Sequence, residues 1–281
     1  MFLGEEGFKG RHELKILISY GEYLALSSRM GALLEHDSHS GDDGYFIRSL
    51  YLDDNGDSAY YDKLNGIGDR KKYRIRSYNF DSGYITLECK EKRGQYVHKT
   101  SAVLSVSEYE AIRDGDFSVL GSRKENVCRE VYAAARSKGL HNSVIVDYSR
   151  DPYVYPASNV RITFDRELHA AGFECFDIFD KGLVSVPVFM NNSVILEVKC
   201  DDHLPEMIRS VIPSFVGTPL SVSKYCLCRN INRYIRCNEK GMMKPLLLDL
   251  LRVVGLLVVP LLALAAVMEA YVTPLAMQLF M

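Results

Sequence analysis

The sequence predicts an α+β fold, in which an antiparallel β-barrel is surrounded by helices and followed by a hydrophobic C-terminal helix. Three observations support this prediction. About eight strand-like segments occur without regular alternation with helices, which favours an antiparallel sheet over a doubly wound parallel one. Glu-x-Lys recurs on three strands distant in the sequence, starting at Glu13, Glu88 and Glu197. From residue 246 onward the chain carries few strongly polar side chains.

The predicted elements begin with a strand at residues 11–18, whose sequence is RHELKILI. A helix follows to about residue 35, because Ser19 and Glu22 form the S-x-x-E capping-box pattern. Branched and aromatic residues between turn residues predict further strands at 45–53, 71–79, 84–92, 97–104, 144–148, 159–168 and 193–200. Further helices are predicted at 57–64, 107–114 with a capped start at Ser107, 125–138, 203–211 and 224–237.

Composition indicates one large domain, residues 1–240, and a hydrophobic tail, residues 241–281. The net charge of −2 argues against a general nucleic-acid binder, but it permits a basic cavity because the charges can separate in space. Seven cysteines and a polar start without a signal peptide fit a reducing, cytosolic compartment. Cys226 and Cys228 lack a second ligand pair at zinc spacing, which favours buried thiols over a metal site.

Charges recur at every second position along the predicted strands, and such residues share one face of a sheet. The sets that share a face are Arg11, Glu13 and Lys15; Arg74 and Arg76; Glu88, Lys90 and Lys92; Arg161 and Asp165; and Glu197, Lys199 and Asp201. A solvated outer face is the ordinary interpretation of such alternation. The repeated Glu-x-Lys, with apolar residues on the opposite faces, favours charged faces that line the interior of a closed barrel.

A barrel of about eight strands holds side chains or one slim ligand. Lys, Arg and Glu inside it need compensation, since buried charges must be paired. A polyanion supplies the pairing, because phosphate oxygens suit Arg and Lys. Carboxylates can in addition hold a divalent cation that bridges phosphates. No P-loop sequence is present, so the phosphates would not be bound by such a loop.

The segments that carry these charges resemble a known family. RHELK, IRSLYLDD, KYRIRSYN, LECKEKRG, VIVDYSRDPY, NVRITFDREL, ILEVK and SKY, in this order over residues 11–236, resemble the VTC domain. The VTC domain is the polyphosphate polymerase branch of the CYTH, or triphosphate tunnel, group. The resemblance implies a triphosphate tunnel fold and transfer of the ATP γ-phosphate to a growing inorganic polyphosphate chain, with Mn²⁺ or Mg²⁺ as cofactor.

The resemblance also implies roles for individual residues. The cations that it places on phosphates are Lys15, Arg74, Arg76, Lys90, Lys99, Arg161, Lys199 and Lys224. Arg11 and Arg48 are further candidates for substrate binding, although Arg48 could equally pair with an acidic neighbour. Glu197 would bind the metal, with Glu88 and Glu13 as helpers. Tyr225 is interpreted as a packing residue.

One departure bears on the activity. Hydrolytic and cyclase relatives carry E-x-E-x-K on the first strand, whereas this chain has Arg11-x-Glu13-x-Lys15. An Arg in place of a carboxylate weakens the case for a two-metal hydrolase and favours the polymerase. A tunnel triphosphatase that hydrolyses triphosphate or nucleoside triphosphates, and a non-catalytic polyphosphate-binding module, remain the alternatives.

The tail is predicted to anchor the catalytic domain on the cytoplasmic side of a membrane. Residues 253–268 are uncharged, a run shorter than the ~20 residues that span a bilayer, and residues 271–281 extend it. Basic residues precede the tail, which keeps the preceding domain cytoplasmic by the positive-inside rule. A buried or oligomerising helix is the alternative.

Overall fold

The computed structural model describes residues 12–37, 40–41, 44–94, 96–201, 204–212, 221 and 223–239. Arg11 and the predicted tail at 241–281 lie outside the described residues. Among the described helices, none is both long and apolar enough to cross a membrane. Contacts separate a compact unit that ends at Asn232 from the residues that follow it. The fold and the site below belong to that first unit.

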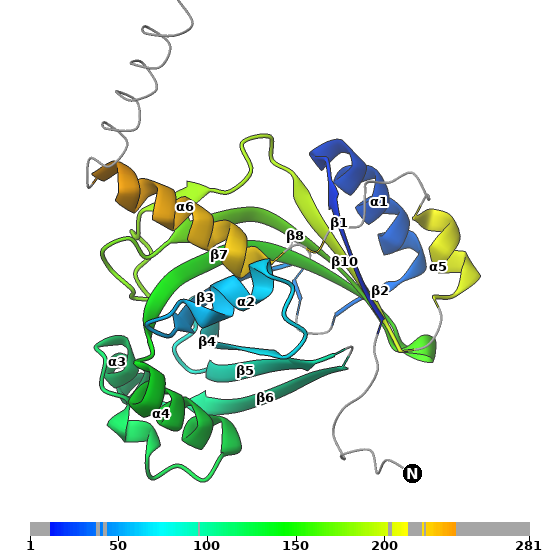
Figure 1. Cartoon of the computed structure of the whole chain (residues 1–281). Helices are drawn as coiled ribbons and strands as arrows, with labels where there is room; N and C mark the ends of the chain where they lie inside the picture. The colour runs from blue at the N-terminus through cyan, green and yellow to red at the C-terminus, as the bar shows by residue number, and fades with distance from the viewer. Residues whose placement is uncertain are drawn as a thin grey trace, which may run out of the picture. The chain divides into compact units, whose positions relative to one another are not determined.

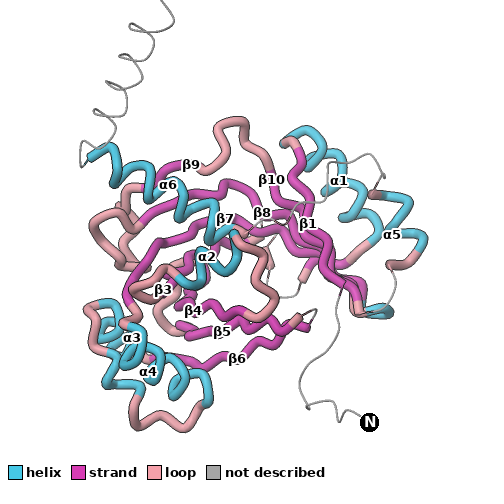
Figure 2. The backbone as a smooth tube through the Cα atoms, viewed as in Figure 1, coloured by secondary structure: helices cyan, strands magenta, loops and turns pink. Residues whose placement is uncertain are grey.

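An antiparallel sheet forms the framework of the unit (Figures 1 and 2). Its strands follow the spatial order β1 (His12–Ile18), β10 (Val194–Cys200), β8 (Val160–Ala171), β7 (His141–Tyr155), β3 (Tyr45–Asp53), β4 (Arg70–Tyr78), β5 (Ile85–Arg93) and β6 (Tyr96–Leu104). Two short strands lie off this path: β2 (Glu35–His36) pairs with β7, and β9 (Ser185–Pro187) with β8. The sequence predicted all eight strands of the path, and it missed β2 and β9.

The sheet is curled rather than closed. β1 and β6 stand at the two ends of the strand order, with no pairing between these two described strands, so the predicted closed barrel is an open half-barrel. Side chains nevertheless meet across the interior, where Lys90 of β5 reaches Glu13 of β1. Lys15 and Lys199 also face Lys90 from that side, and like charges oppose closer approach of the two walls.

The helices begin and end where capping residues allow. α1 (Tyr20–Leu33) has the predicted capping box of Ser19 and Glu22. The box of α3 (Val106–Arg113) is formed by Ser105 and Glu108, so the predicted start at Ser107 is wrong by two residues. α4 (Asn126–Lys138) ends at Gly139, whose φ of 67° suits a residue without a side chain. The remaining helices are α2 (Ser58–Leu64), α5 (Glu206–Val211), α6 (Lys224–Glu239) and the 3₁₀ turns Phe117–Leu120 and Pro156–Ser158.

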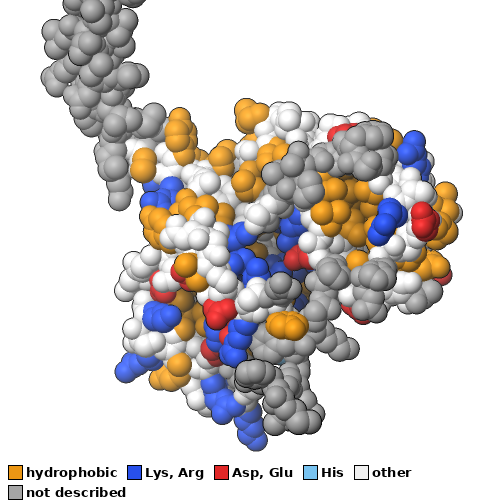
Figure 3. Space-filling view, turned by 45° about the vertical axis from the view of Figure 1, so that its right-hand side comes forward, with side chains coloured by type: hydrophobic (Ala, Val, Ile, Leu, Met, Phe, Trp, Pro, Cys, Tyr) orange, Lys and Arg blue, Asp and Glu red, His pale blue; other side chains and the backbone are white. Residues whose placement is uncertain are grey.

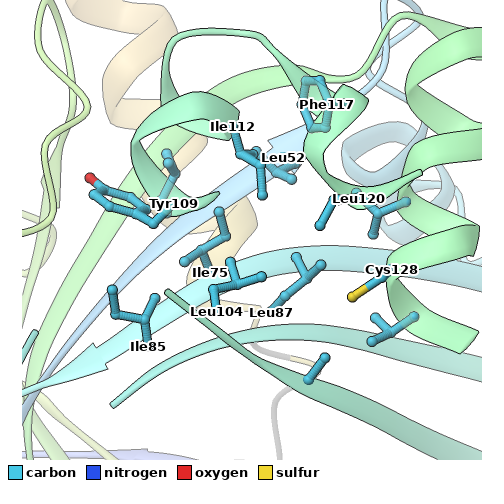
Figure 4. Packing of buried hydrophobic residues seen from close by; sticks show 14 of the residues in the cluster. Leu52, Ile75, Ile85, Leu87, Leu104, Tyr109, Ile112, Phe117, Leu120 and Cys128 are labelled. Atoms are coloured by element: carbon cyan, nitrogen blue, oxygen red, sulfur yellow. The ribbon is translucent and has the colours of Figure 1, made fainter. Parts of the chain in front are cut away.

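Two apolar cores cover the outer face of the sheet. Leu52, Ile75 and Leu87 pack beneath α3, the turn Phe117–Leu120 and α4 (Figure 4). On the other half of the sheet, a second core fills the space under α1 and α5, with Ile16 and Phe164 among its members. Because alternate residues of a strand point to opposite faces, burial of these side chains turns the intervening charged residues inward.

A third apolar cluster covers part of the inner face. Ile47, Val146 and Ile195 of the sheet pack against α2 and the start of α6, which lie across strands β3 and β7 (Figure 1). Buried Asp53 ties these elements together. It accepts hydrogen bonds from the backbone N–H groups of Ala59 and Tyr60 and from the Tyr225 hydroxyl. The start of α6 is therefore fixed against the sheet, with Lys224 beside it.

Candidate functional site

The uncovered part of the inner face carries the charged residues. Cross-strand register places Glu13 opposite Lys199, Lys15 opposite Glu197, and Arg74 opposite Glu88. The inner-face cations of the sheet are Lys15, Lys72, Arg74, Arg76, Lys90, Lys99, Arg150, Arg161 and Lys199, and α6 adds Lys224. The carboxylates among them are Glu13, Glu88, Asp165 and Glu197. Figure 3 shows Lys and Arg side chains gathered in a hollow of the surface. Cations therefore outnumber carboxylates on the described part of this face.

Glu13 and Glu197 form one carboxylate pair on neighbouring strands. Lys15 Nζ lies 2.9 Å from Glu13 Oε1 and 3.9 Å from Glu197 Oε1, and Lys199 Nζ lies 3.5 and 2.5 Å from the same two atoms. Burial raises the pKa of Glu197, but a hydrogen bond with Glu13 and the lysine charges, including Lys224, hold it well below its usual range. Glu197 is therefore an ionised carboxylate, although it is 5% exposed.

Asp165 occupies the deepest position of the charged face, at 1% exposure. Arg150 donates to both of its oxygens, at 2.6 and 2.9 Å, and Lys224 is 2.5 Å from Oδ2. Lys224 Nζ and Arg150 Nη2 also lie 3.9 and 4.0 Å from Glu197 Oε2. This network connects the carboxylate pair to the start of α6, so α6 helps to determine where the cations of β7 and β10 point.

Glu88 is enclosed by cations. Arg74 Nη2 contacts its Oε2 at 2.6 Å, and Lys99 Nζ contacts its Oε1 at 2.7 Å. Burial raises the pKa of Glu88, but the charges of Arg74, Arg76 and Lys99 lower it to about 2. Both oxygens are therefore engaged as ion-pair acceptors. The role of Glu88 as a helper in metal binding stays a prediction, because cations contact both oxygens of Glu197 as well.

Arg76 differs from its neighbours because its partners are neutral. Its guanidinium donates to the hydroxyls of Ser49 at 3.1 Å, Tyr148 at 3.2 Å and Tyr78 at 3.4 Å. The residue is 6% exposed, and in the described part of the chain no carboxylate comes within ion-pair distance of it. A buried cation is costly unless an anion accompanies it. The charge of Glu88 favours the Arg76 cation from beyond ion-pair distance, but no ion pair with a described residue occupies the guanidinium, so Arg76 can donate directly to an external anion.

Lys90 shows the same imbalance in a weaker form. Its ammonium lies 3.7 Å from Glu13 Oε2, which is its one ion-pair partner among the described residues. Burial lowers the pKa of Lys90 to about 8; Glu13 opposes that effect, and Lys15 and Lys199 add to it. Strands β1 and β10 on one side of the half-barrel and β5 on the other thus place lysine ammonium groups opposite one another. An anion bound between them would relieve this repulsion.

Two further predicted residues, Arg161 and Arg48, lie on opposite faces of the sheet. Arg161 lies on the inner face, where it contacts Asp37 at 2.8 Å and Tyr45 at 3.3 Å. Arg48 points to the opposite face and binds both oxygens of Asp147, at 2.9 and 2.7 Å. Of the two interpretations of Arg48, the structure therefore supports the ion pair with an acidic neighbour and corrects its assignment to the substrate-binding set.

A divalent metal, which the resemblance implies, fits the Glu13–Glu197 pair only in part. Among the described residues, no group of three or more His, Cys, Asp or Glu side chains is arranged to hold a metal ion. Two touching carboxylates are nevertheless a donor set that Mg²⁺ accepts when substrate phosphates complete its coordination. The residues thus fit a metal that is shared with a phosphate ligand.

Sequence reasoning missed Arg150, Asp165 and Lys72 as site residues. Lys72 continues the alternation of Arg74 and Arg76 on β4, so the period of two was a sufficient signal for it. Asp165 had been placed on the face of Arg161, without a role. Arg150 lay beyond the predicted end of its strand, because β7 continues to Tyr155 rather than ending at Tyr148.

Comparisons with known proteins identify a family that the chain matches. A model of the VTC domain family matches residues 10–231. Among solved structures, the chain is similar to a putative adenylate cyclase from Bacillus halodurans, with 16% identity and a TM-score of 0.42, over 73% of this chain and 87% of the other. A putative adenylate cyclase from Vibrio parahaemolyticus shows 9% identity and a TM-score of 0.37, over 72% and 81%. No curated protein matches the sequence.

Proposed function

Because this chain belongs to the VTC domain family, we propose that it is a triphosphate-tunnel enzyme that transfers the γ-phosphoryl group of ATP to the end of an inorganic polyphosphate chain. The observation that carries the proposal is Arg76, a buried guanidinium that has only hydroxyl partners on a face where cations are in excess. A linear polyanion would supply the direct anionic partner that Arg76 lacks among the described residues. The forked guanidinium is suited to phosphate oxygens.

In the proposed reaction, a terminal oxygen of the chain forms a bond to the γ-phosphorus of ATP. The bond between that phosphorus and the bridging oxygen breaks, and the electron pair leaves with ADP. Phosphoryl transfer needs alignment and charge neutralisation more than covalent help from the protein. Arg74, Arg76 and Lys90 would hold the phosphates from β4 and β5, and their fixed positions would align the two reacting groups.

Strands β1 and β10 and the start of α6, across the half-barrel from β4 and β5, would hold the remaining phosphates. Lys15 and Lys199 flank the carboxylate pair, and Lys224 reaches it from α6. Glu13 and Glu197 would hold the Mn²⁺ or Mg²⁺, which when bound neutralises charge on phosphate oxygens. Lys99, Arg161 and Arg150 complete the cationic lining.

The test is turnover by the full chain with ATP and Mn²⁺, with products separated on a gel and stained for polyphosphate. We expect a ladder or smear of polymer, and its loss in Lys90→Ala and in Glu197→Ala. Lys124→Gln, which removes an exposed cation outside the hollow, serves as the matched control and should leave the product unchanged. Orthophosphate as the sole product would favour the tunnel hydrolase, and binding without turnover would favour the non-catalytic module; either outcome contradicts the polymerase.

The predicted membrane anchor stays a separate proposal, because its residues are not among those described. We propose that a tail at 241–281 holds the catalytic unit at the cytoplasmic face of a membrane. Its apolar composition and the basic residues before it support this proposal. Separation of the full chain into membrane and soluble fractions tests it.

A further inference from the structure

Tyr225, the second residue of α6, lies where this helix meets the sheet, and it is 1% exposed. Its hydroxyl donates to the Asp53 carboxylate and lies 3.2 Å from Ser143 Oγ. Because the hydroxyl has a single proton, Ser143 is the donor in the second contact. Burial and the charge of Asp53 raise the pKa of Tyr225, so the proton stays on the hydroxyl. A side chain that only filled space would need neither partner, so the two hydrogen bonds indicate a role beyond packing.

Asp53 joins the start of α6 to the start of α2. Besides the Tyr225 hydroxyl, it accepts hydrogen bonds from the backbone N–H groups of Ala59 and Tyr60, at 2.9 and 3.2 Å. Both groups belong to the first turn of α2, where backbone N–H groups have no partner within the helix. The carboxylate is therefore held in place by α2, and it offers the Tyr225 hydroxyl a fixed acceptor.

Lys224 directly precedes Tyr225 and is the cation that α6 contributes to the interior. Its Nζ lies 2.5 Å from Asp165 Oδ2 and 3.9 Å from Glu197 Oε2. Successive residues of an α-helix project about 100° apart, so Lys224 and Tyr225 point in different directions from the helix axis. A rotation of α6 about its axis would move both side chains away from their partners. The Tyr225 hydroxyl opposes that rotation, because its acceptor is fixed.

The ring of Tyr225 makes contacts that do not involve its hydroxyl. The ring is stacked on Tyr51 with a centroid distance of 5.0 Å, and Lys72 Nζ lies 5.0 Å from its centre. Tyr51 in turn accepts a hydrogen bond from Arg74 Nη1 at 3.0 Å. Phe in place of Tyr would keep these ring contacts and remove the hydroxyl alone. The substitution thus separates an effect on Lys224 from an effect on the cations of β4.

Other contacts keep α6 attached when the hydroxyl is absent. Arg229 Nη2 donates to Asp57 Oδ1 at 2.8 Å, and Asn230 Oδ1 accepts from the Tyr60 hydroxyl at 2.5 Å. Both contacts lie at least one helical turn beyond Tyr225, so they hold the helix against α2 without holding its first residues. Tyr225→Phe should therefore fold, with a change confined to the start of α6.

We propose that Tyr225 is a positioning residue for the phosphate site: its hydroxyl, held by Asp53, fixes the rotation of α6 and thereby the place of Lys224 beside the reacting phosphates. This inference rests on the proposed function, because Lys224 is one of the cations assigned to phosphate there. It gives Tyr225 a role beyond the packing that the sequence suggested. Tyr225 acts through Lys224, since its own hydroxyl is occupied by Asp53 and Ser143.

A double-mutant cycle in the full chain tests the proposal. Tyr225→Phe, Lys224→Gln and the double variant are titrated with tripolyphosphate in a calorimeter, in the presence of EDTA. Lys224→Gln should weaken binding by about tenfold, the loss expected for one charge-assisted contact. Tyr225→Phe should weaken it by about three- to fivefold, and the double variant should bind like Lys224→Gln alone, because the hydroxyl acts through the lysine. A double variant weakened by the product of the two single losses would overturn the proposal.

Tyr109→Phe is the matched control for loss of a buried hydroxyl. The Tyr109 hydroxyl accepts from the Ile178 N–H and donates to the Phe176 carbonyl, in the apolar core beneath α3 on the outer face. Both Tyr→Phe variants should lower the melting temperature, whereas only Tyr225→Phe should weaken tripolyphosphate binding. Equal weakening in both variants, or wild-type affinity in Tyr225→Phe, would overturn the positioning role.

Failure of the proposed function has a different signature. If the wild type does not bind tripolyphosphate, with or without metal, the proposed function fails and the positioning role falls with it. Binding by the wild type with independent effects of the two substitutions overturns the positioning role alone.

Discussion

Lys90 Nζ of β5 and Glu13 Oε2 of β1 lie 3.7 Å apart, although five strands separate β5 from β1 in the sheet. The curl of the sheet brings them together across the charged interior. Lys15 and Lys199 stand on the side of Glu13, so Lys90 meets both an anion and two cations there. The two sides of the interior, β1 with β10 and β4 with β5, thus carry more positive than negative charge. A bound anion would balance this excess.

Binding of a phosphate chain should draw protons from the solvent. In the free protein the pKa values of Lys90 and Lys72 are lowered to about 8, and a bound polyanion raises both. Near pH 8.5 both lysines are largely deprotonated in the free protein, so binding should take up about one proton or more. At pH 6.5 both lysines are already protonated, so this proton uptake should vanish. Titration of tripolyphosphate and of long polyphosphate in buffers with different ionisation enthalpies measures this number.

Two variants give the control for that measurement. Lys90→Gln and Lys72→Gln should each reduce the uptake of protons on binding of the phosphate chain. An enthalpy independent of the buffer at pH 8.5 would show that neither lysine changes protonation, and it would contradict this description of the interior.

Replacement of Glu88 should make stability less dependent on pH at acid pH. The folded-state pKa of about 2 lies below the usual value of 4.5, so the carboxylate contributes stability above pH 4.5 that is lost as the pH falls toward 2. Glu88→Gln should lower the free energy of unfolding by about 3 kcal/mol at pH 7, with the difference disappearing near pH 2. Urea unfolding between pH 2 and 7 checks this, with Glu110→Gln on the exposed face of α3 as the control. A difference that does not change with pH would contradict the ion-pair role.

Arg48 and Arg76 should respond in opposite ways to the same substitution. Arg48→Met leaves the buried Asp147 carboxylate without its partner, so it should lower the free energy of unfolding by about 3–5 kcal/mol. Tripolyphosphate affinity of the folded variant should stay within about twofold of the wild type. Arg76→Met removes a cation that has no ion-pair partner among the described residues, so stability should be largely maintained while affinity falls by about tenfold or more. Chemical unfolding and titration of the two variants side by side test this; a similar affinity loss in both would contradict the assignment of the two faces.

Removal of the metal should abolish phosphoryl transfer without abolishing binding of the phosphate chain. EDTA should abolish turnover while the cations of the inner face still bind a phosphate chain. Glu197→Gln should raise the Mn²⁺ concentration needed for half-maximal turnover by about tenfold, because one of the two carboxylate donors is lost. Metal titrations of the turnover rate measure this, with Glu110→Gln as the control. An unchanged metal requirement would exclude Glu197 as a ligand.

The sequence predicted the local structure correctly where a single signal, such as the alternation of side chains along a strand, was strong. The strand at 45–53 was predicted to the residue, because aromatic and branched side chains alternate between two polar turns. The period of two placed Glu13, Lys15, Glu197 and Lys199 on one face, and register confirms that they are cross-strand neighbours. The membership in the VTC domain family, predicted from the ordered motifs, is confirmed over residues 10–231.

What was missed depended on tertiary context. β7 continues through Pro152, a residue that is usually excluded from central strands; its pairing with β3 ends at Arg150, and the short strand β2 takes that side of β7 at Tyr153. Arg150 was overlooked as a result. Arg48 shares its side of β3 with Leu50, a signal that the sequence analysis did not use, and its partner Asp147 lies on a strand distant in sequence. The open half-barrel is a property of the whole strand order, which local sequence patterns do not contain.

The fate of the γ-phosphate tests the central claim most directly. The full chain is incubated with Mn²⁺ and ATP labelled at the γ-position, and the label is followed into polymer, ADP and orthophosphate. We predict that the label enters polyphosphate, with one ADP formed for each phosphate incorporated, and that Arg76→Met loses this incorporation while Lys124→Gln retains it. Label found only in orthophosphate, or incorporation that survives Arg76→Met, would contradict a polymerase built on this charged interior.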